Sequence, residues 1–147
     1  MRATKRALCL ILATFSIYSL CACGGNSEPI EVPTENPVEL AKAKLEEAYN
    51  TCCKGSKTVY AKLEYDGISL TVDTSPNDTK YSSYEADAIA AIQRINLYLA
   101  LPASLLEKMS STRVLGDTHS QNCGTYTVTW NYHSDNGLKV IYEVNAQ

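Results

Sequence analysis

The sequence lacks the short motifs that mark the common catalytic sites. It contains no Gly-x-Ser-x-Gly, no His-Glu-x-x-His, no glycine-rich phosphate loop and no Cys-x-x-Cys pair. The sequence therefore gives no motif evidence for a serine hydrolase, a zinc protease, a nucleotide-binding enzyme or a dithiol oxidoreductase. We therefore expect a protein without a cofactor, and an enzyme is the less favoured class.

Long apolar runs and clusters of Lys or Arg are missing after residue 23. No later stretch approaches the roughly 20 apolar residues that a membrane-spanning helix needs. Residues 1–22 hold three of the 13 basic residues and none of the 16 acidic ones, so the rest of the chain carries a formal charge of about −6. That charge disfavours nucleic acid as a partner, and it disfavours binding to anionic lipid through charge.

What the N-terminus does contain is the pattern of a secretory signal. Three basic residues, Arg2, Lys5 and Arg6, precede a predominantly apolar stretch, 7–22. This stretch is too short to span a membrane. The stretch ends in Leu20-Cys21-Ala22-Cys23, which closely resembles the lipobox of bacterial lipoproteins. The resemblance implies that residues 1–22 are removed, that Cys23 receives a diacylglyceryl thioether, and that its new amino group is acylated, for example with palmitate. Cys21 fits less well because Leu20 is too bulky for the position before the cut.

The lipobox resemblance predicts where the protein is located and how the chain is divided. Anchored through Cys23, the protein would lie on the extracytoplasmic side of the cell membrane. Residues 23–36 contain two of the five prolines and predict a flexible tether. Its thirteen residues after Cys23 reach about 45 Å when fully extended. Residues 37–147 have the length of one domain. The alternative is an ordinary cleaved signal peptide that happens to contain cysteines.

Two longer helices and one short helix are expected in this domain. Asn36-Pro37-Val38-Glu39 has the pattern of a helix start, and Gly55 is a plausible stop. Ser82-Ser83-Tyr84-Glu85 is a capping box for a second helix, which Pro102 ends before a short helix through Met109. The apolar positions of the two longer helices recur at helical spacing: Val38, Ala41, Leu45, Ala48 and Cys52, then Tyr84, Ala88, Ala91, Ile92, Ile95 and Leu99.

Alternating residues predict two hairpins. Residues 59–65 and 68–73 flank a turn at Asp66-Gly67, and residues 125–133 and 138–144 flank a three-residue loop at 135–137. The expected cross-strand pairs are Tyr65 with Ile68, Leu63 with Leu70, Ala61 with Val72, Trp130 with Tyr142, and Tyr132 with Val140. Residues 114–115 are a further candidate strand. The order α-β-β-α-(β)-β-β predicts an α+β fold, an antiparallel sheet of four to five strands with helices on one face.

Two stretches resemble small uncharacterised lipoproteins of Gram-positive bacteria. The first runs from Ile95-Asn96 through Leu101-Pro102 to Leu105-Leu106-Glu107-Lys108-Met109. The second comprises Thr129-Trp130-Asn131-Tyr132-His133 and Asn136-Gly137-Leu138-Lys139-Val140-Ile141-Tyr142. The resemblance covers about 50 residues and implies no activity.

The uncovered face of the sheet is the first candidate binding surface. The predicted strands place Trp130 in the core and an opposite set of mostly polar residues in solvent: Thr125, Thr127, Thr129, Asn131, His133, Lys139, Ile141 and Glu143. A threonine-rich face hydrogen-bonds well to a sugar or a protein. The second candidate is the polar segment 117–123, predicted to be a loop, whose His119 could bind a partner.

The cysteines leave three readings open. In an oxidising compartment Cys123 is expected to form a disulfide with Cys52 or Cys53, and Cys53 is slightly favoured because it lies at the edge of its helix. A thiol enzyme or small hydrolase using His119 and Cys123 is the alternative function. A zinc site of Cys52, Cys53, Cys123 and His119 is disfavoured because adjacent cysteines are poor tetrahedral partners.

These observations favour a membrane-anchored, extracytoplasmic, non-enzymatic module. Its expected contacts are the membrane, through the lipid on Cys23, and a protein or cell-envelope component, through the open sheet face or the 117–123 segment. A solute-binding lipoprotein is less favoured, because one domain of this size lacks the two lobes that close around a solute.

Overall fold

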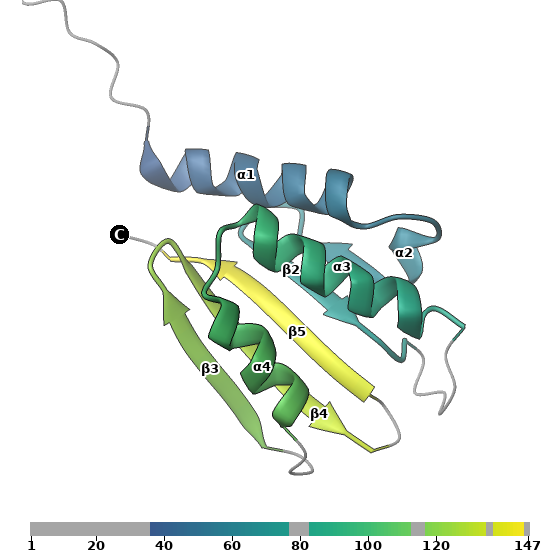
Figure 1. Ribbon diagram of the computed structural model, residues 1–147. Helices are drawn as coiled ribbons and strands as arrows, with labels where there is room; N and C mark the ends of the chain where they lie inside the picture. Colours follow the sequence, from purple (N-terminus) through teal and green to yellow (C-terminus); the bar gives the residue numbers. More distant parts are fainter. Residues whose placement is uncertain (1–35, 77–82, 113–116, 135–136, 146–147) are drawn as a thin grey trace, which may run out of the picture. The chain divides into compact units, whose positions relative to one another are not determined.

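Four helices and five strands make up the part of the chain that the structure describes. The structure is a computed structural model, and it describes residues 36–76, 83–112, 117–134 and 137–145. In chain order the elements are α1 (Pro37–Cys52), α2 (Lys57–Tyr60), β1 (Ala61–Leu63), β2 (Ser69–Asp73), α3 (Glu85–Tyr98), α4 (Ala103–Ser111), β3 (Thr118–Cys123), β4 (Tyr126–His133) and β5 (Gly137–Val144). Figure 1 shows α1, α3 and α4 on one side of a single sheet. The predicted α+β class, with its antiparallel sheet, is confirmed.

Helix α1 begins where its capping residues predict. The Asn36 side chain accepts a hydrogen bond from the Val38 N–H at 3.0 Å, and Pro37 occupies the first helical position. Its apolar stripe is buried from Ala41 to Cys52. The helix ends before Gly55, which has a left-handed φ of +62° in the following turn. The Arg94 Nε donates to the Cys52 carbonyl at 2.8 Å and thereby satisfies one carbonyl at the helix end.

The sheet has the order β1-β2-β5-β4-β3, and every neighbouring pair is antiparallel. The first hairpin has the predicted register, with Ala61 opposite Val72 and Leu63 opposite Leu70. Its ends differ from the prediction. Residues 57–60 form the single turn α2 instead of strand, and Tyr65 is fully exposed in the turn. The apolar face of this hairpin therefore does not extend to its tip.

The register of β4 and β5 differs by two residues from the predicted one. Trp130 lies opposite Val140 and Tyr132 opposite Leu138, because His133 already pairs with Gly137. Gly137, predicted as the last residue of the loop, has a left-handed φ of +68° but belongs to the strand. Two hydrogen bonds from Thr74 fix the start of β5. The Thr74 N–H donates to the Leu138 carbonyl at 2.9 Å, and the Thr74 Oγ1 accepts from the Leu138 N–H at 2.8 Å. A shift of two residues preserves the side-chain alternation, so the inward face is the predicted one.

Helix α3 begins at Glu85, later than the capping box predicts. Tyr84 precedes its first turn without a side-chain hydrogen bond to the helix. Ser82 lies outside the described residues, as do residues 114–115. Two carboxylates, Glu85 and Asp87, occupy the first turn, where they compensate the helix dipole.

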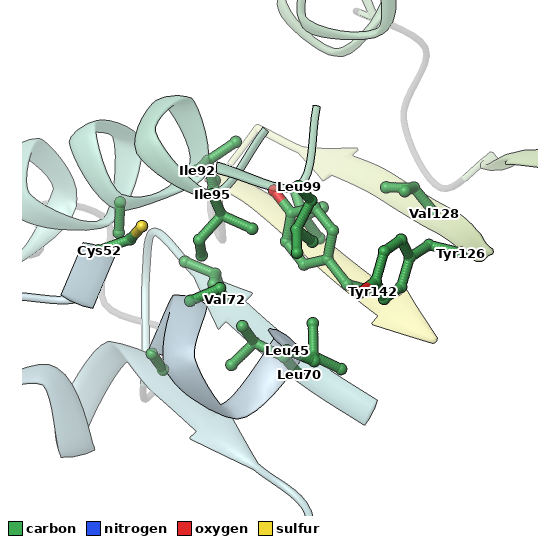
Figure 2. Close-up of a cluster of buried hydrophobic side chains, with 14 of the residues drawn as sticks. Leu45, Cys52, Leu70, Val72, Ile92, Ile95, Leu99, Tyr126, Val128 and Tyr142 are labelled. Carbon is green, nitrogen blue, oxygen red and sulfur yellow. The ribbon is translucent and has the colours of Figure 1, made fainter. Parts of the chain in front are cut away.

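The core lies between the helices and one face of the sheet. Figure 2 shows Leu45 from α1 and Ile92 and Ile95 from α3 against Val72, Val128 and Tyr142 of the sheet. Trp130 is buried at 4% exposure, and its indole N–H donates to Thr112 Oγ1 at 3.0 Å. The compact unit Thr34–Gln147 contains all of these elements and its own hydrophobic core. Such a unit has what a domain needs to fold alone.

One polar side chain, Asn96, is buried within the stripe of α3. Its Oδ1 accepts a hydrogen bond from the Tyr142 hydroxyl at 2.9 Å, and its Nδ2 lies 3.9 Å from Met109 Sδ. Asn96 therefore links α3 both to strand β5 and to α4.

None of the described helices is long and apolar enough to cross a bilayer.

Candidate binding face

The sheet face opposite the helices presents three rows of mostly polar side chains, of which the central row crosses all five strands. The central row runs from β1 to β3 as Lys62, Thr71, Ile141, Thr129 and Ser120. The flanking rows are Ser69, Glu143, Thr127 and Asn122 on one side, and Asp73, Lys139, Asn131 and Thr118 on the other. These thirteen residues are called the open face below. Hydroxyl and amide groups predominate, and Ile141 is its single apolar side chain.

The charges on the open face are balanced. Lys139 Nζ lies 4.0 Å from Asp73 Oδ2 on the neighbouring strand, and Lys62 Nζ lies 2.8 Å from Glu64 Oε1 beside the face. Such exposed pairs contribute little to stability. Together they leave no strong field of either sign, so the open face is suited to a partner that is itself close to neutral.

Several hydroxyls on the open face are already oriented by neighbours. Thr129 Oγ1 and Ser120 Oγ lie 3.2 Å apart across β4 and β3. Thr127 Oγ1 donates to Asn145 Oδ1 at 2.7 Å. A hydroxyl has two acceptor lone pairs besides its proton, so each of these groups keeps capacity for a ligand.

The sequence correctly placed Thr127, Thr129 and Asn131 on this face. His133 follows them at the end of β4, opposite Gly137. The residues from β1, β2 and β3 were missed. Ser69 and Thr71 carry an alternation visible in the sequence, but that alternation does not reveal that β2 lies beside β5. The polar residues of β3 were missed because the segment was assigned to a loop.

The prediction of a loop at 117–123 is wrong, because residues 118–123 form the edge strand β3 paired along its length with β4. His119 therefore lies on the helix-covered side. Its ring stacks on Trp130 with centroids 5.6 Å apart and planes 20° apart. Its Nε2 is buried and has no hydrogen-bond partner among the described residues. His119 is thus part of the packing around Trp130 and does not belong to the open face.

The structure does not assemble a Cys–His catalytic pair from His119 and Cys123. Both belong to β3, and four residues along a strand separate their Cα atoms by about 13 Å. A nucleophile and its base need to be within hydrogen-bond distance. The Cys123 thiol contacts Gln121 instead, with its Sγ 3.6 Å from the Gln121 Nε2 and 3.8 Å from the Gln121 carbonyl oxygen.

The expected disulfide is not formed in the structure, where Cys52, Cys53 and Cys123 are free. Cys123 lines a cavity together with Ala41 near the start of α1, whereas Cys52 is the last residue of that helix. The helix rise between those two positions is about 16 Å. A disulfide needs Cα atoms within roughly 7 Å, and Cys123 lies beside the start of α1 whereas Cys52 lies at its end. The disulfide of Cys123 with Cys52 or Cys53 stays a prediction.

Cys53 is buried as deeply as Cys52 and does not lie at an exposed helix edge. Burial, and secondarily the neighbouring Cys52 thiol, raise the pKa of Cys53 to about 11, and burial also raises the pKa of Cys52. Both groups are therefore protonated at neutral pH, which makes them poor nucleophiles. No cluster of three metal-ligating side chains occurs within the described ranges.

Comparisons with known proteins do not assign a family. No family model, no curated protein and no solved structure matches this chain. Cys23 and the rest of the predicted signal and tether lie outside the described residues. The chemistry of the open face and the residues of the N-terminal sequence therefore carry the functional proposal.

Proposed function

We propose that this protein is a lipid-anchored, non-enzymatic module that binds a neutral glycan of the cell envelope through its open face. The observation that carries the proposal is the five-strand central row, with Thr71 and Thr129 on either side of Ile141. The anchor is Cys23, on the lipobox pattern, and the location is the extracytoplasmic side of the membrane.

The composition of the open face favours a glycan over a protein as the partner. Protein interfaces depend on buried aromatic, Met or Arg side chains at their centre. The open face holds none of these, and its one apolar side chain is Ile141. Hydroxyl and amide groups arranged at strand spacing match the hydroxyl and acetamido groups of a neutral polysaccharide. A polymer also offers repeated contacts to a module held beside it, which raises the effective affinity.

Co-sedimentation with an insoluble neutral polysaccharide of acetamido sugars tests the partner. The test variant combines Thr71→Val with Thr129→Val, which keeps the β-branched shape but removes two hydroxyls. The matched control combines Thr51→Val with Thr58→Val, which are exposed positions of α1 and α2. The wild type, the test variant and the control variant are all made as residues 24–147, which retain the compact unit Thr34–Gln147.

We expect the wild type and the control to sediment with the glycan. Loss of two hydrogen bonds should weaken the test variant roughly tenfold. Equal sedimentation of all three proteins would contradict the role of the open face. Failure of the wild type to bind would overturn the glycan as partner.

The anchor is tested separately by the mass and membrane retention of the full chain. Wild-type protein should carry added lipid mass and remain in the membrane fraction, whereas Cys23→Ala should carry none. An unmodified wild type with the same membrane retention as the variant would contradict lipidation, whatever the glycan experiment shows.

A further inference from the structure

The helix-covered side of the molecule contains a cleft between α3 and α4. It has a volume of about 440 Å³ and lies over the start of β5 and the end of β4. Its apolar lining comes from two helices and two strands: Ile89 and Ile92 of α3, Leu106 and Met109 of α4, Tyr132 of β4 and Leu138 of β5. Ligand pockets in proteins have volumes of roughly 300 to 1,000 Å³ and are lined mainly by such side chains.

The floor and the mouth of the cleft differ in character. Ile92 and Met109 are each only 2% exposed, so the floor is part of the core. Ile89 stands 40% exposed at the mouth, beside Glu85 and Gln93 of the same helix. An exposed isoleucine next to an open apolar cavity is poorly placed in water, and a bound apolar molecule would cover it.

The charge of the side chains that line the cleft limits which ligands the cleft can bind. Among the described lining residues Glu85 is the only one that carries a charge. An anionic group at the mouth would meet this carboxylate, whereas a neutral polar group would find the Gln93 amide and the Ser134 hydroxyl as hydrogen-bond partners. From these observations we propose that the cleft binds a small, uncharged, largely apolar molecule. This site is on the side of the sheet opposite the open face, so it does not depend on the glycan proposal.

The protein's single tryptophan reports on this site. Thr112 lines the cleft, and its Oγ1 accepts the hydrogen bond of the Trp130 indole. A fluorescent ligand in the cleft will therefore lie close enough to Trp130 to take up its excitation energy. Two probes with one skeleton separate apolar fit from charge: neutral N-phenyl-1-naphthylamine, and 1-anilinonaphthalene-8-sulfonate, which adds a sulfonate.

Titration of residues 24–147 with each probe, read as sensitised probe emission on excitation of Trp130, tests the proposal. We expect saturable binding of the neutral probe and, at low salt, roughly fivefold weaker binding of the sulfonate. Glu85→Gln should strengthen binding of the sulfonate and leave the neutral probe unchanged. Ile89→Lys should weaken the neutral probe roughly tenfold, since it removes an apolar wall.

Two further variants guard against indirect effects. Ser110→Phe places a ring into the cleft from an exposed position of α4 and should also displace the neutral probe. Leu97→Ser removes an 81% exposed apolar side chain from α3 outside the cleft and should change nothing. Unsaturable binding, or binding that persists in both Ile89→Lys and Ser110→Phe, would overturn the proposal. Equal loss in Leu97→Ser would assign the probe to the general surface and would overturn it too.

Discussion

The buried hydrogen bond between Asn96 and Tyr142 gives the sharpest prediction about what holds the helices on the sheet. Tyr142 is fully buried and Asn96 is 6% exposed. Their 2.9 Å bond joins α3 to the central strand β5. Tyr142→Phe removes only the hydroxyl, so Asn96 Oδ1 is left in the core without a donor. Burying an unsatisfied polar group costs about 1–3 kcal/mol of unfolding free energy.

Removing the other partner should cost a similar amount, and removing both should cost little more. Asn96→Leu leaves the Tyr142 hydroxyl buried and unpaired, and it gives up the weak contact with Met109 Sδ. In the double variant Asn96→Leu/Tyr142→Phe neither unpaired group remains. We therefore expect a double-mutant cycle with a coupling of about 1–2 kcal/mol, the double variant being more stable than the sum of the single changes implies.

Urea unfolding followed by circular dichroism measures the four free energies of the cycle. Equal m-values across the set are needed for the comparison, because a changed m-value signals a changed unfolded or native state. Additive losses within about 0.3–0.5 kcal/mol would show that the Asn96 and Tyr142 side chains are not coupled. Such a result would mean that water reaches this pair, or that the two groups do not bond in solution.

The remaining predictions concern the core, the two faces and alkaline pH. Trp130→Ala should cost about 3–5 kcal/mol in urea unfolding, because it empties a core site and leaves Thr112 Oγ1 without its indole donor; a loss below about 1 kcal/mol would show that Trp130 is not in the core. Thr129→Ala with Asn131→Ala, on the open face, should change stability by less than about 1 kcal/mol, and a larger loss in the same assay would show that the face is packed against another part of the chain. Burial raises the pKa of the Cys53 thiol to about 11 in the folded state. The unfolding free energy that this shift contributes is therefore fully present below pH 9 and is lost as the pH rises from 9 to 11. Cys53→Ala should flatten the pH dependence of the unfolding free energy in that range, and an unchanged slope would contradict the burial of the thiol.

Some elements of the fold follow directly from local residues. Asn36 and Pro37 set the start of α1, and the apolar stripe from Ala41 to Cys52 sets its buried face. The alternation around Val128 and Trp130 defines β4. In these segments capping, periodicity and burial agree, so a short window of sequence carries enough information.

Other elements depend on partners that are distant in the chain. Strand β3 has no apolar alternation, since it is an edge strand whose exposure alternates only between exposed and half-buried. It is a strand because its backbone pairs with β4. The register of β5 depends on Thr74, which lies 64 residues before Leu138. No local pattern shows such a contact.

The residues of the candidate sites likewise fall into those that a single strand reveals and those that depend on distant parts of the chain. Thr127, Thr129 and Asn131 were found because alternation along one strand is visible in sequence. The contribution of β2 and β3 to the open face depends on strand order, which the sequence does not state. The cleft combines Ile89, Met109 and Leu138 from three elements, and each of these side chains alone resembles an ordinary core residue.

Photo-cross-linking in intact cells tests whether the anchored protein binds an envelope glycan through its open face. A photoreactive residue is placed at position 129 of the open face or at position 97 on the outer side of α3. We predict an adduct from position 129 that a glycan-cleaving enzyme removes, and no such adduct from position 97. An adduct at position 129 that survives glycan digestion and yields peptides of a second protein in mass spectrometry would contradict this proposal and assign a protein partner. Cross-linking from position 97 alone would contradict the assignment of the face.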